Sequence, residues 1–425
     1  MYGVLIGVGL ALGLAVVPQF ARQKAGNSVV VTPKEVVSQE DVADAEARAR
    51  VLHDKIQGIV FGAVVGDALG RVTEFIETTD AIALKYGAKG ISSFKDFTPG
   101  DWIMHPYSQN RDCIAAYTDD TLMSLIVLEE ALRYTDAQAL TDAIALRFRG
   151  LFGKNAFIID PLYHVRAHGI QNRVACTRPE AKSNIEESPA YDKERDQAVS
   201  QEGGCGSVMR AWPLGIIFYT DLEKVALFAD FQSRITHRNP MARAASAALA
   251  VGIASLLQGN DPDTTVDHMI KAAQKFDEAE MLYKPTAHKE LDAASIKEDR
   301  LLTSDMIAYA AQQARAGIEP RDILGTHNTK LQNRSSEGFL LGWAADEAVA
   351  AAVYVFLRHF NDMGAALQES VNTPGDSDSI ATLAAALVGA HGGWKTFKAT
   401  GFDYSSLENK AGIEKLLEEV ILHVD

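Results

Sequence analysis

Two groups of acidic and hydroxyl residues each stand directly ahead of a helical pattern, although they lie far apart along the chain. Their residues are Thr118-Asp119-Asp120-Thr121 and Asp376-Ser377-Asp378-Ser379. A helix N-cap is one explanation, because such side chains accept hydrogen bonds from unpaired N–H groups and complement the helix dipole. For the first group taken alone, capping is the favoured explanation. In the second it explains one aspartate and not both, and alternate residues of an extended segment can converge on one point.

Carboxylate and hydroxyl oxygens are the hard ligands that Mg²⁺ or Mn²⁺ prefers. If the two helix starts meet, unpaired carboxylates would raise one another's pKa values and destabilise the fold, and divalent cations would offset this cost. EF-hand spacing, His-rich zinc spacing and a Walker loop are all absent from the sequence. The two groups therefore predict an open site for a pair of Mg²⁺ or Mn²⁺ ions.

A third carboxylate, Glu74, follows a run in which Gly62, Gly66 and Gly70 recur at every fourth position. Such glycines can simply permit close packing of helices. Alternatively, the turn presents Glu74 to a cleft, where it could act as a general acid or base or bridge to a metal-bound water. The sequence leaves both interpretations open.

The segment from Gly203 to Arg210 is rich in glycine, and backbone N–H groups in such a loop can approach a pyrophosphate closely. An ordinary turn is the alternative. Cys205 lies within it, but no Cys/His signature surrounds this residue, which favours a small buried thiol over a nucleophile. His237 shortly precedes a helical pattern and could contact a ligand or cap that helix.

The elements that would position these residues are helices. Apolar residues recur at three- and four-residue spacing from about residue 45 onward, as in Ile380, Leu383, Ala384, Leu387 and Val388. Many buried positions are small, which indicates closely packed helices and an all-α domain instead of a layered sheet. Polar stretches at 177–202 and 276–300 interrupt the pattern without marking domain boundaries, since motifs fall on both sides of each.

Composition excludes some classes of function. The 425 residues are 47% hydrophobic and 23% charged, which is typical of a globular protein and excludes global disorder. Lys and Arg total 41 against 56 Asp and Glu, and a formal charge of −15 disfavours a broad nucleic-acid-binding surface. The cysteines at 113, 176 and 205 are too widely spaced to indicate a disulfide framework or a structural zinc site.

The N-terminal segment differs from the rest. Residues 3–17 are almost wholly apolar and uncharged, and Arg22 and Lys24 follow them. Residues 3–20 could form a short membrane anchor with the following chain on the cytoplasmic side. A secretory signal is disfavoured because no cation precedes the apolar run, while a mis-assigned start or a packed apolar helix remains open. We therefore expect an apolar segment at 1–21, a polar linker at 22–44 and a helical domain at 45–425.

Taken in chain order, these motifs resemble those of the ADP-ribosylglycohydrolase family, which includes the glycohydrolase that reactivates dinitrogenase reductase. The resemblance covers about residues 51–393. The matching stretches are Gly66-Asp67-Ala68-Leu69-Gly70 with Glu74, Thr118-Asp119-Asp120-Thr121, Gly204-Cys205-Gly206-Ser207-Val208-Met209-Arg210, Thr236-His237, Gly342-Trp343-Ala344-Ala345-Asp346-Glu347-Ala348 and Gly375-Asp376-Ser377-Asp378-Ser379.

The resemblance implies an all-α fold: a compact single domain of many orthogonally packed helices around a central cleft with two Mg²⁺ or Mn²⁺ ions. Glu74 would match the family's flexible catalytic glutamate, with Asp119 as the second catalytic candidate. Ser377 and Ser379 replace threonines but keep the hydroxyl, whereas Cys205 replaces an asparagine and leaves the acceptor group open. The implied metal ligands are Thr118, Asp119, Asp120, Asp376, Asp378 and Ser379. The implied ADP-ribose-binding residues are Gly204, Gly206, Ser207, Met209 and His237.

The implied reaction is hydrolysis of the glycosidic bond at C1″ of ADP-ribose, which would remove ADP-ribose from a modified protein, nucleic acid or small molecule. A non-catalytic ADP-ribose-binding sensor or a structural relative of the family is the alternative. We expect a monomer whose partner is its ADP-ribosylated substrate. We also expect it in the cytoplasm or at the cytoplasmic face of a membrane.

Overall fold

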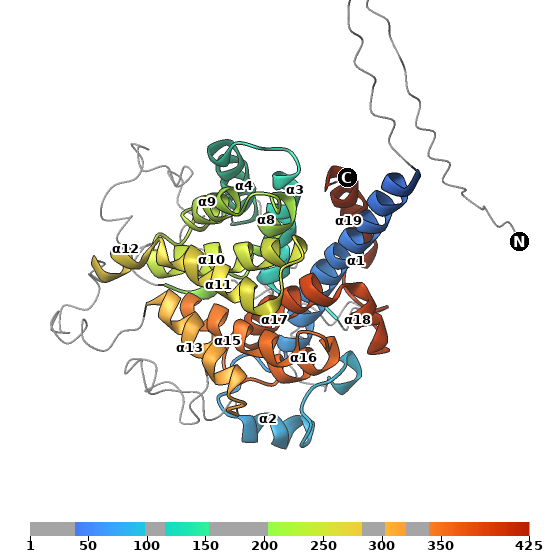
Figure 1. Cartoon of the computed structure of the whole chain (residues 1–425). Helices are drawn as coiled ribbons and strands as arrows, with labels where there is room; N and C mark the ends of the chain where they lie inside the picture. Colours follow the sequence, from blue (N-terminus) through green and yellow to red (C-terminus); the bar gives the residue numbers. More distant parts are fainter. Residues whose placement is uncertain (1–38, 98–114, 153–202, 283–301, 320–339, 425) are drawn as a thin grey trace, which may run out of the picture. The chain divides into compact units, whose positions relative to one another are not determined.

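The computed structural model describes residues 39–97, 115–152, 203–282, 302–319 and 340–424. Helices dominate these residues, and their extended pairing is limited to two isolated bridges, Ala115–Leu407 and Gly204–Ala344 (Figure 1). The predicted all-α class is confirmed. The apolar segment at 1–21 and most of the linker at 22–44 lie outside the described residues.

The first part of the described chain, up to residue 257, consists mainly of helices. They are α1 (Gln39–Gly70), α2 (Thr79–Tyr86), the 3₁₀ helix η1 (Phe94–Asp96), α3 (Asp119–Ala131), α4 (Ala137–Phe152), the 3₁₀ helix η4 (Cys205–Ser207), α8 (Trp212–Ile217), α9 (Leu222–Ser233) and α10 (Pro240–Leu257).

The remaining helices follow α10 in the chain. They are α11 (Pro262–Gln274), α12 (Asp277–Leu282), α13 (Thr303–Arg315), α15 (Ala345–His359), α16 (Met363–Ser370), α17 (Ser377–Gly392), α18 (Trp394–Ala399) and α19 (Lys410–Val424). Of these, α11, α13, α15 and α17 pack against α10.

The chain separates into two units, residues 1–45 and residues 46–425. Of the first unit the structure describes residues 39–45, which form the first turns of α1. Helix α1 therefore starts at Gln39, inside the segment 22–44 that the sequence analysis assigned to a linker. Everything described below belongs to the second unit.

Helix α10 is buried along nearly its whole length: apart from Arg243, all of its side chains are buried. Asn239 caps it by accepting a hydrogen bond from the Met241 N–H at 3.0 Å, and Pro240 occupies its first position. Among the described helices, α10 alone is long and apolar enough to cross a membrane, yet 94% of it is buried inside the protein. A helix that is apolar on all sides is also what the centre of a helical domain requires.

Helices α1 and α17 pack with their backbones almost in contact. A Cβ atom built on Gly62 would lie 2.8 Å from the Ala385 carbonyl oxygen, and one on Gly66 would lie 2.5 Å from that of Ala381. One on Gly70 would lie 2.6 Å from the Ser377 carbonyl oxygen. The glycine repeat therefore serves close helix packing, and it brings the end of α1 against the first turn of α17.

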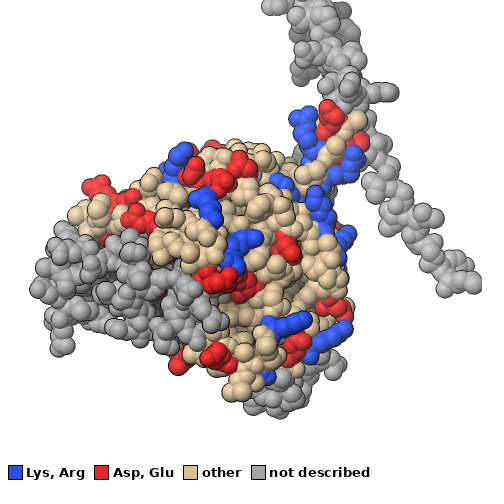
Figure 2. All heavy atoms as spheres, turned by 60° about the horizontal axis from the view of Figure 1, so that its bottom comes forward, with Lys and Arg blue, Asp and Glu red and all other residues tan. Residues whose placement is uncertain are grey.

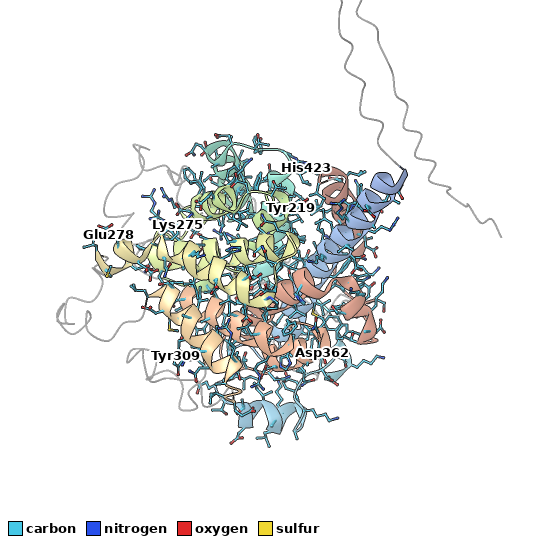
Figure 3. The ribbon with its side chains drawn as sticks, in the orientation of Figure 1. Tyr219, Lys275, Glu278, Tyr309, Asp362 and His423 are labelled. Carbon is cyan, nitrogen blue, oxygen red and sulfur yellow. The ribbon has the colours of Figure 1, made fainter. Side chains whose placement is uncertain are left out.

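The outer face carries charges of both signs. Blue and red side chains are interspersed over the described part of the face in Figure 2. Lys275, labelled at the periphery in Figure 3, pairs with Glu223 of α9. Such exposed pairs contribute little to stability, so the fold depends on the buried contacts.

Candidate metal centre

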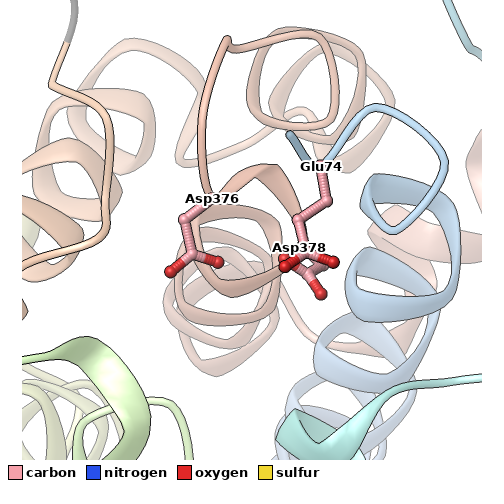
Figure 4. Close-up of side chains that lie close together, drawn as sticks. All are labelled: Glu74, Asp376 and Asp378. Carbon is pink, nitrogen blue, oxygen red and sulfur yellow. The ribbon is translucent and has the colours of Figure 1, made fainter. Parts of the chain in front are cut away.

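Carboxylates from two distant parts of the chain meet where α1 ends and α17 begins. Glu74, Asp376 and Asp378 each place one oxygen within 4.8 Å of the others (Figure 4). All three are buried, with exposed fractions of 8%, 3% and 3%. The close packing of Gly70 on α17 makes this meeting possible, because Glu74 follows that glycine by one turn.

Hydrogen bonds fix the turn that carries Glu74. The Phe75 N–H donates to the Gly375 carbonyl at 3.1 Å, and the Gly375 N–H donates to the Ile76 carbonyl at 3.3 Å. The Ser377 hydroxyl donates to the Gly70 carbonyl at 2.8 Å and lies 3.0 Å from the Thr73 hydroxyl. The side chain of Ser377 therefore holds the two segments together.

The loop that carries Asp376 is fixed from its other side. The Asp376 N–H donates to the Leu341 carbonyl at 2.7 Å. Gly375 adopts φ +96°, and a Cβ atom there would lie 2.4 Å from the same carbonyl oxygen. A residue with a side chain would be strained and would clash, so this position requires glycine.

Asp67 of α1 positions the first acidic group, a role that the sequence analysis missed. Its carboxylate accepts hydrogen bonds from the Thr118 N–H at 2.9 Å and the Thr121 N–H at 2.9 Å, which are unpaired donors at the start of α3. Burial and the nearby charge of Asp378 raise the pKa of Asp67 to about 7. An aspartate between the packing glycines was the available signal, but its partner lies far along the chain.

The two acidic groups interact electrostatically. Burial, followed by the charge of Asp378, raises the pKa of Asp120 well above its ordinary value. The same two causes raise the pKa of Glu74, with further contributions from Asp376, Asp119 and Asp120. Burial is also the main cause that raises the pKa values of Asp376 and Asp378. The structure therefore brings the helix starts of α3 and α17 together with Glu74.

Two of these carboxylate oxygens have no hydrogen-bond partner among the described residues. Glu74 Oε2 and Asp120 Oδ1 are buried, and no hydrogen-bond donor contacts either of them in the described part of the chain. Burying unsatisfied carboxylates destabilises a protein unless a cation or a proton compensates. Closely spaced oxygens of this kind fit a hard divalent cation, and so the residues present match a metal centre.

The hydroxyl residues predicted as ligands lie beside these carboxylates. Thr118 is the N-cap of α3, and its hydroxyl lies 3.3 Å from both the Asp120 N–H and Asp120 Oδ2. The Ser379 hydroxyl lies 3.7 Å from the sulfur of Cys205. All the predicted metal ligands, Asp119 included, are buried.

The glycine-rich loop joins the same centre through Cys205. Its thiol donates to Asp376 Oδ2 at 2.7 Å, and its N–H donates to the Trp343 carbonyl at 3.1 Å. Burial and the Asp376 charge raise the pKa of this thiol well above its ordinary value. The sequence analysis favoured a small buried thiol at Cys205; the structure places this thiol, half-buried, against a candidate metal ligand.

The remaining predicted substrate-binding residues divide into two kinds. Gly204 and Gly206 are partly exposed, whereas Ser207, Met209 and His237 are buried. Ser207 contacts the Ser233 hydroxyl at 2.9 Å, and His237 Nδ1 lies 2.7 Å from the Thr236 hydroxyl.

His237 belongs to an internal polar network behind the loop. Arg210 donates to the Thr236 hydroxyl at 2.7 Å, and the Ser233 hydroxyl donates to the His237 carbonyl at 3.1 Å. Burial and the Arg210 charge lower the pKa of His237 to about 3, so its imidazole is neutral. These contacts support the loop from within the protein.

The chain belongs to the ADP-ribosylglycohydrolase family, because the sequence model of that family matches residues 48–424. The predicted resemblance is confirmed. The chain is 25% identical over 351 residues to ADP-ribosylhydrolase ARH3 of Homo sapiens, with 80% of this chain and 85% of that protein covered. The ARH3 of Bos taurus gives the same identity and coverage.

Two further proteins are similar to this chain. An uncharacterized protein of Archaeoglobus fulgidus is 24% identical over 343 residues, which cover 80% of this chain and 88% of that protein. A solved structure of an ADP-ribosylglycohydrolase-related protein complex shares the fold, with a TM-score of 0.52 and 20% identity over 88% of this chain and 100% of that one. Family membership and the ARH3 relatives support an ADP-ribose glycohydrolase activity.

Proposed function

We propose that this protein hydrolyses the glycosidic bond at C1″ of ADP-ribose and so removes ADP-ribose from a modified protein, nucleic acid or small molecule. The observation that carries the proposal is the convergence of Glu74, Asp376 and Asp378. The start of α3 joins them through Asp67, in a chain whose family is named for this chemistry. The proposal includes two divalent cations, Mg²⁺ or Mn²⁺.

The proposed ligands of these cations are the oxygen donors of the two helix starts. When bound, the ions would supply Lewis acidity and anchor the ribose hydroxyls and the attacking water. The unpartnered oxygen of Asp120 and the raised pKa values of the aspartates support this assignment, because such carboxylates favour a bound cation. The ligands are Thr118, Asp119, Asp120, Asp376, Asp378 and Ser379.

Glu74 is the proposed proton carrier. Burial and the neighbouring carboxylates raise the pKa of Glu74, which favours its protonated form, and Oε2 has no competing hydrogen bond within the described residues. In the hydrolysis, the oxygen of water bonds to C1″ as the bond from C1″ to the leaving atom breaks. Glu74 would give its proton to the leaving atom, and the proton that the water loses would return to the Glu74 carboxylate. The neighbouring carboxylates would stabilise positive charge that develops at C1″, and Asp119 is the second candidate for the proton transfer.

The glycine-rich loop is the proposed ADP-ribose-binding segment. Gly204 and Gly206 are partly exposed beside Cys205, so backbone N–H groups there could approach the pyrophosphate. Ser207, Met209 and His237 would set the conformation of this loop, because Ser207 and His237 belong to the buried polar network behind it and the Met209 side chain is buried in the hydrophobic core.

The experiment is to measure ADP-ribose release by the purified protein from substrates modified on arginine, serine or thymidine. We expect release from at least one substrate, its loss on addition of EDTA and its recovery with Mg²⁺ or Mn²⁺. Glu223→Gln, an exposed carboxylate on α9, is the matched control and should retain full activity. If no substrate releases ADP-ribose while ADP-ribose and metal still bind, the sensor alternative is favoured.

We propose in addition that the protein acts as a monomer, in the cytoplasm or tethered to the cytoplasmic face of a membrane through residues 3–20. Those residues lie outside the described part of the chain, so the proposal depends on their apolar sequence. Carbonate-resistant membrane association that disappears when residues 1–21 are deleted would support the tether. Full-length protein that remains entirely in the supernatant would contradict it.

A further inference from the structure

A stacked pair of aromatic rings, an exposed Phe75 and a half-buried Trp343, stands beside the acidic centre. Phe75 and Trp343 stack with ring centroids 5.2 Å apart and an interplanar angle of 22°. The Phe75 side chain is 58% exposed, although it is a large apolar group in a domain with an extensive buried core. Burial alone therefore does not account for a phenylalanine at this position.

The backbone of Phe75 adds to this observation. Phe75 has φ +66°, and the other described residue besides glycine with positive φ is Asn409. Asparagine tolerates this conformation, whereas for a bulky residue it costs on the order of 1–3 kcal/mol. The hydrogen bonds between the 75–76 turn and Gly375 maintain it. A strained backbone that presents an exposed ring next to a candidate catalytic group points to a function for the ring.

Both aromatic residues are tied directly to the acidic centre. Phe75 follows Glu74 in the chain, and its N–H donates to the carbonyl of Gly375, the residue before Asp376. The Trp343 carbonyl accepts a hydrogen bond from Cys205, whose thiol contacts Asp376. The pair therefore lies at the outer edge of the site, next to the proposed proton carrier.

We propose that the Phe75–Trp343 pair is the subsite for the leaving group, and that it selects a planar, π-bonded leaving group such as a guanidino group or a heterocyclic base. The inference rests on the proposed function and goes beyond it by naming the chemical class of the acceptor. Aromatic faces stack on planar groups, and the neighbouring carboxylates further favour a guanidinium cation. A serine hydroxyl offers no plane to stack.

The test compares acceptor classes on ring-removing variants. Phe75→Asn keeps a residue that tolerates positive φ, and Trp343→Leu keeps an apolar side chain. We expect each variant to lose about tenfold in kcat/KM on ADP-ribosylated agmatine or ADP-ribosylated thymidine. We expect less than about a twofold change on an ADP-ribosylated serine peptide, which lacks the stacking contact. Phe75→Tyr, which keeps an aromatic ring, should retain the activity of the wild type. Tyr134 is an exposed aromatic residue elsewhere, and Tyr134→Leu should have no effect.

The outcomes separate this inference from the proposed hydrolase activity. Loss confined to agmatine or to thymidine supports the subsite and identifies the group that it takes. Equal loss on all substrates, or no loss, overturns the subsite while the hydrolase activity stands. If the wild type hydrolyses none of the substrates, the subsite is tested by measuring the binding of free agmatine and free thymidine with saturation-transfer NMR. Binding that both ring-removing variants abolish supports the subsite, and binding that they leave unchanged overturns it.

Discussion

Two glycine-rich segments reach the same centre but use glycine for different purposes. In α1, the missing side chains of Gly62 and Gly66 let the backbone of α17 approach, and the atoms that a Cβ would meet there are carbonyl oxygens that cannot move away. At Gly203, the atom that a Cβ would meet first is the end of the flexible Met241 side chain. The first segment fixes the spacing between carboxylates, whereas the second leaves partly exposed backbone beside them.

The largest effect is expected from filling the α1–α17 contact. Gly66→Val should destabilise the protein by about 3 kcal/mol or more, because the new side chain would push against the Ala381 backbone. Gly203→Ala should cost less than about 1 kcal/mol, since the Met241 side chain can rotate away. Denaturant unfolding of both variants measures the difference. Similar losses at the two positions would remove the distinction between the segments.

The next prediction concerns a ligand at the fixed end. Asp378→Ala should reduce metal-dependent turnover by at least about a hundredfold, because it removes a proposed ligand from the start of α17. The metal-free variant should melt at or above the temperature of the metal-free wild type, because Asp378 raises the pKa values of Asp67, Glu74 and Asp120. Turnover assays and thermal melts check both parts. Undiminished activity in Mg²⁺ would refute the ligand assignment.

A pH series tests the electrostatic cost of the packed carboxylates. The folded-state pKa of Asp67 is raised to about 7 from the ordinary value of 3.8, so the folded state binds more protons between these values. Its contribution to stability is therefore present at acid pH and is lost as the pH rises through about 7. The melting temperature of the metal-free protein should therefore fall between about pH 4 and pH 7.

The control for this series is Asp67→Asn, which cannot ionise and should show a flatter pH profile. Added Mg²⁺ should raise the melting temperature most at the alkaline end, where the carboxylates are charged. A wild-type profile that rises with pH in the absence of metal would contradict the prediction.

The smallest effect is expected at Cys205 in the glycine-rich loop. The Cys205 thiol donates to Asp376 and lowers the pKa of that carboxyl, although burial raises it overall. Cys205→Ala should therefore weaken metal binding at neutral pH by about fivefold, the equivalent of one hydrogen bond, because protons compete better for Asp376. Cys205→Ser keeps a donor and should bind metal nearly as the wild type does. Calorimetric titration with Mg²⁺ measures the affinity of each variant. An unchanged affinity in Cys205→Ala would show that the hydrogen bond from Cys205 to Asp376 does not affect metal binding.

Much of the local structure could be predicted from the sequence. The spacing of apolar residues predicted the helical class, and the polar residues ahead of them marked the starts of α3 and α17, where Thr118 and Asp376 are the N-caps. The motif order predicted the family, which the match over residues 48–424 confirms. These features are encoded within single turns or single helices, so a local pattern suffices to read them.

The contacts between distant segments were decided by the tertiary structure alone. Asp67 binds the start of α3, Cys205 touches Asp376, and the turn after α1 forces Phe75 into a positive φ. None of these leaves a periodic signal, because each depends on how closely two helices approach. The sequence supplied the glycines and the carboxylates; only the packing of α1, α3, α17 and the glycine-rich loop on one another determined which of them meet.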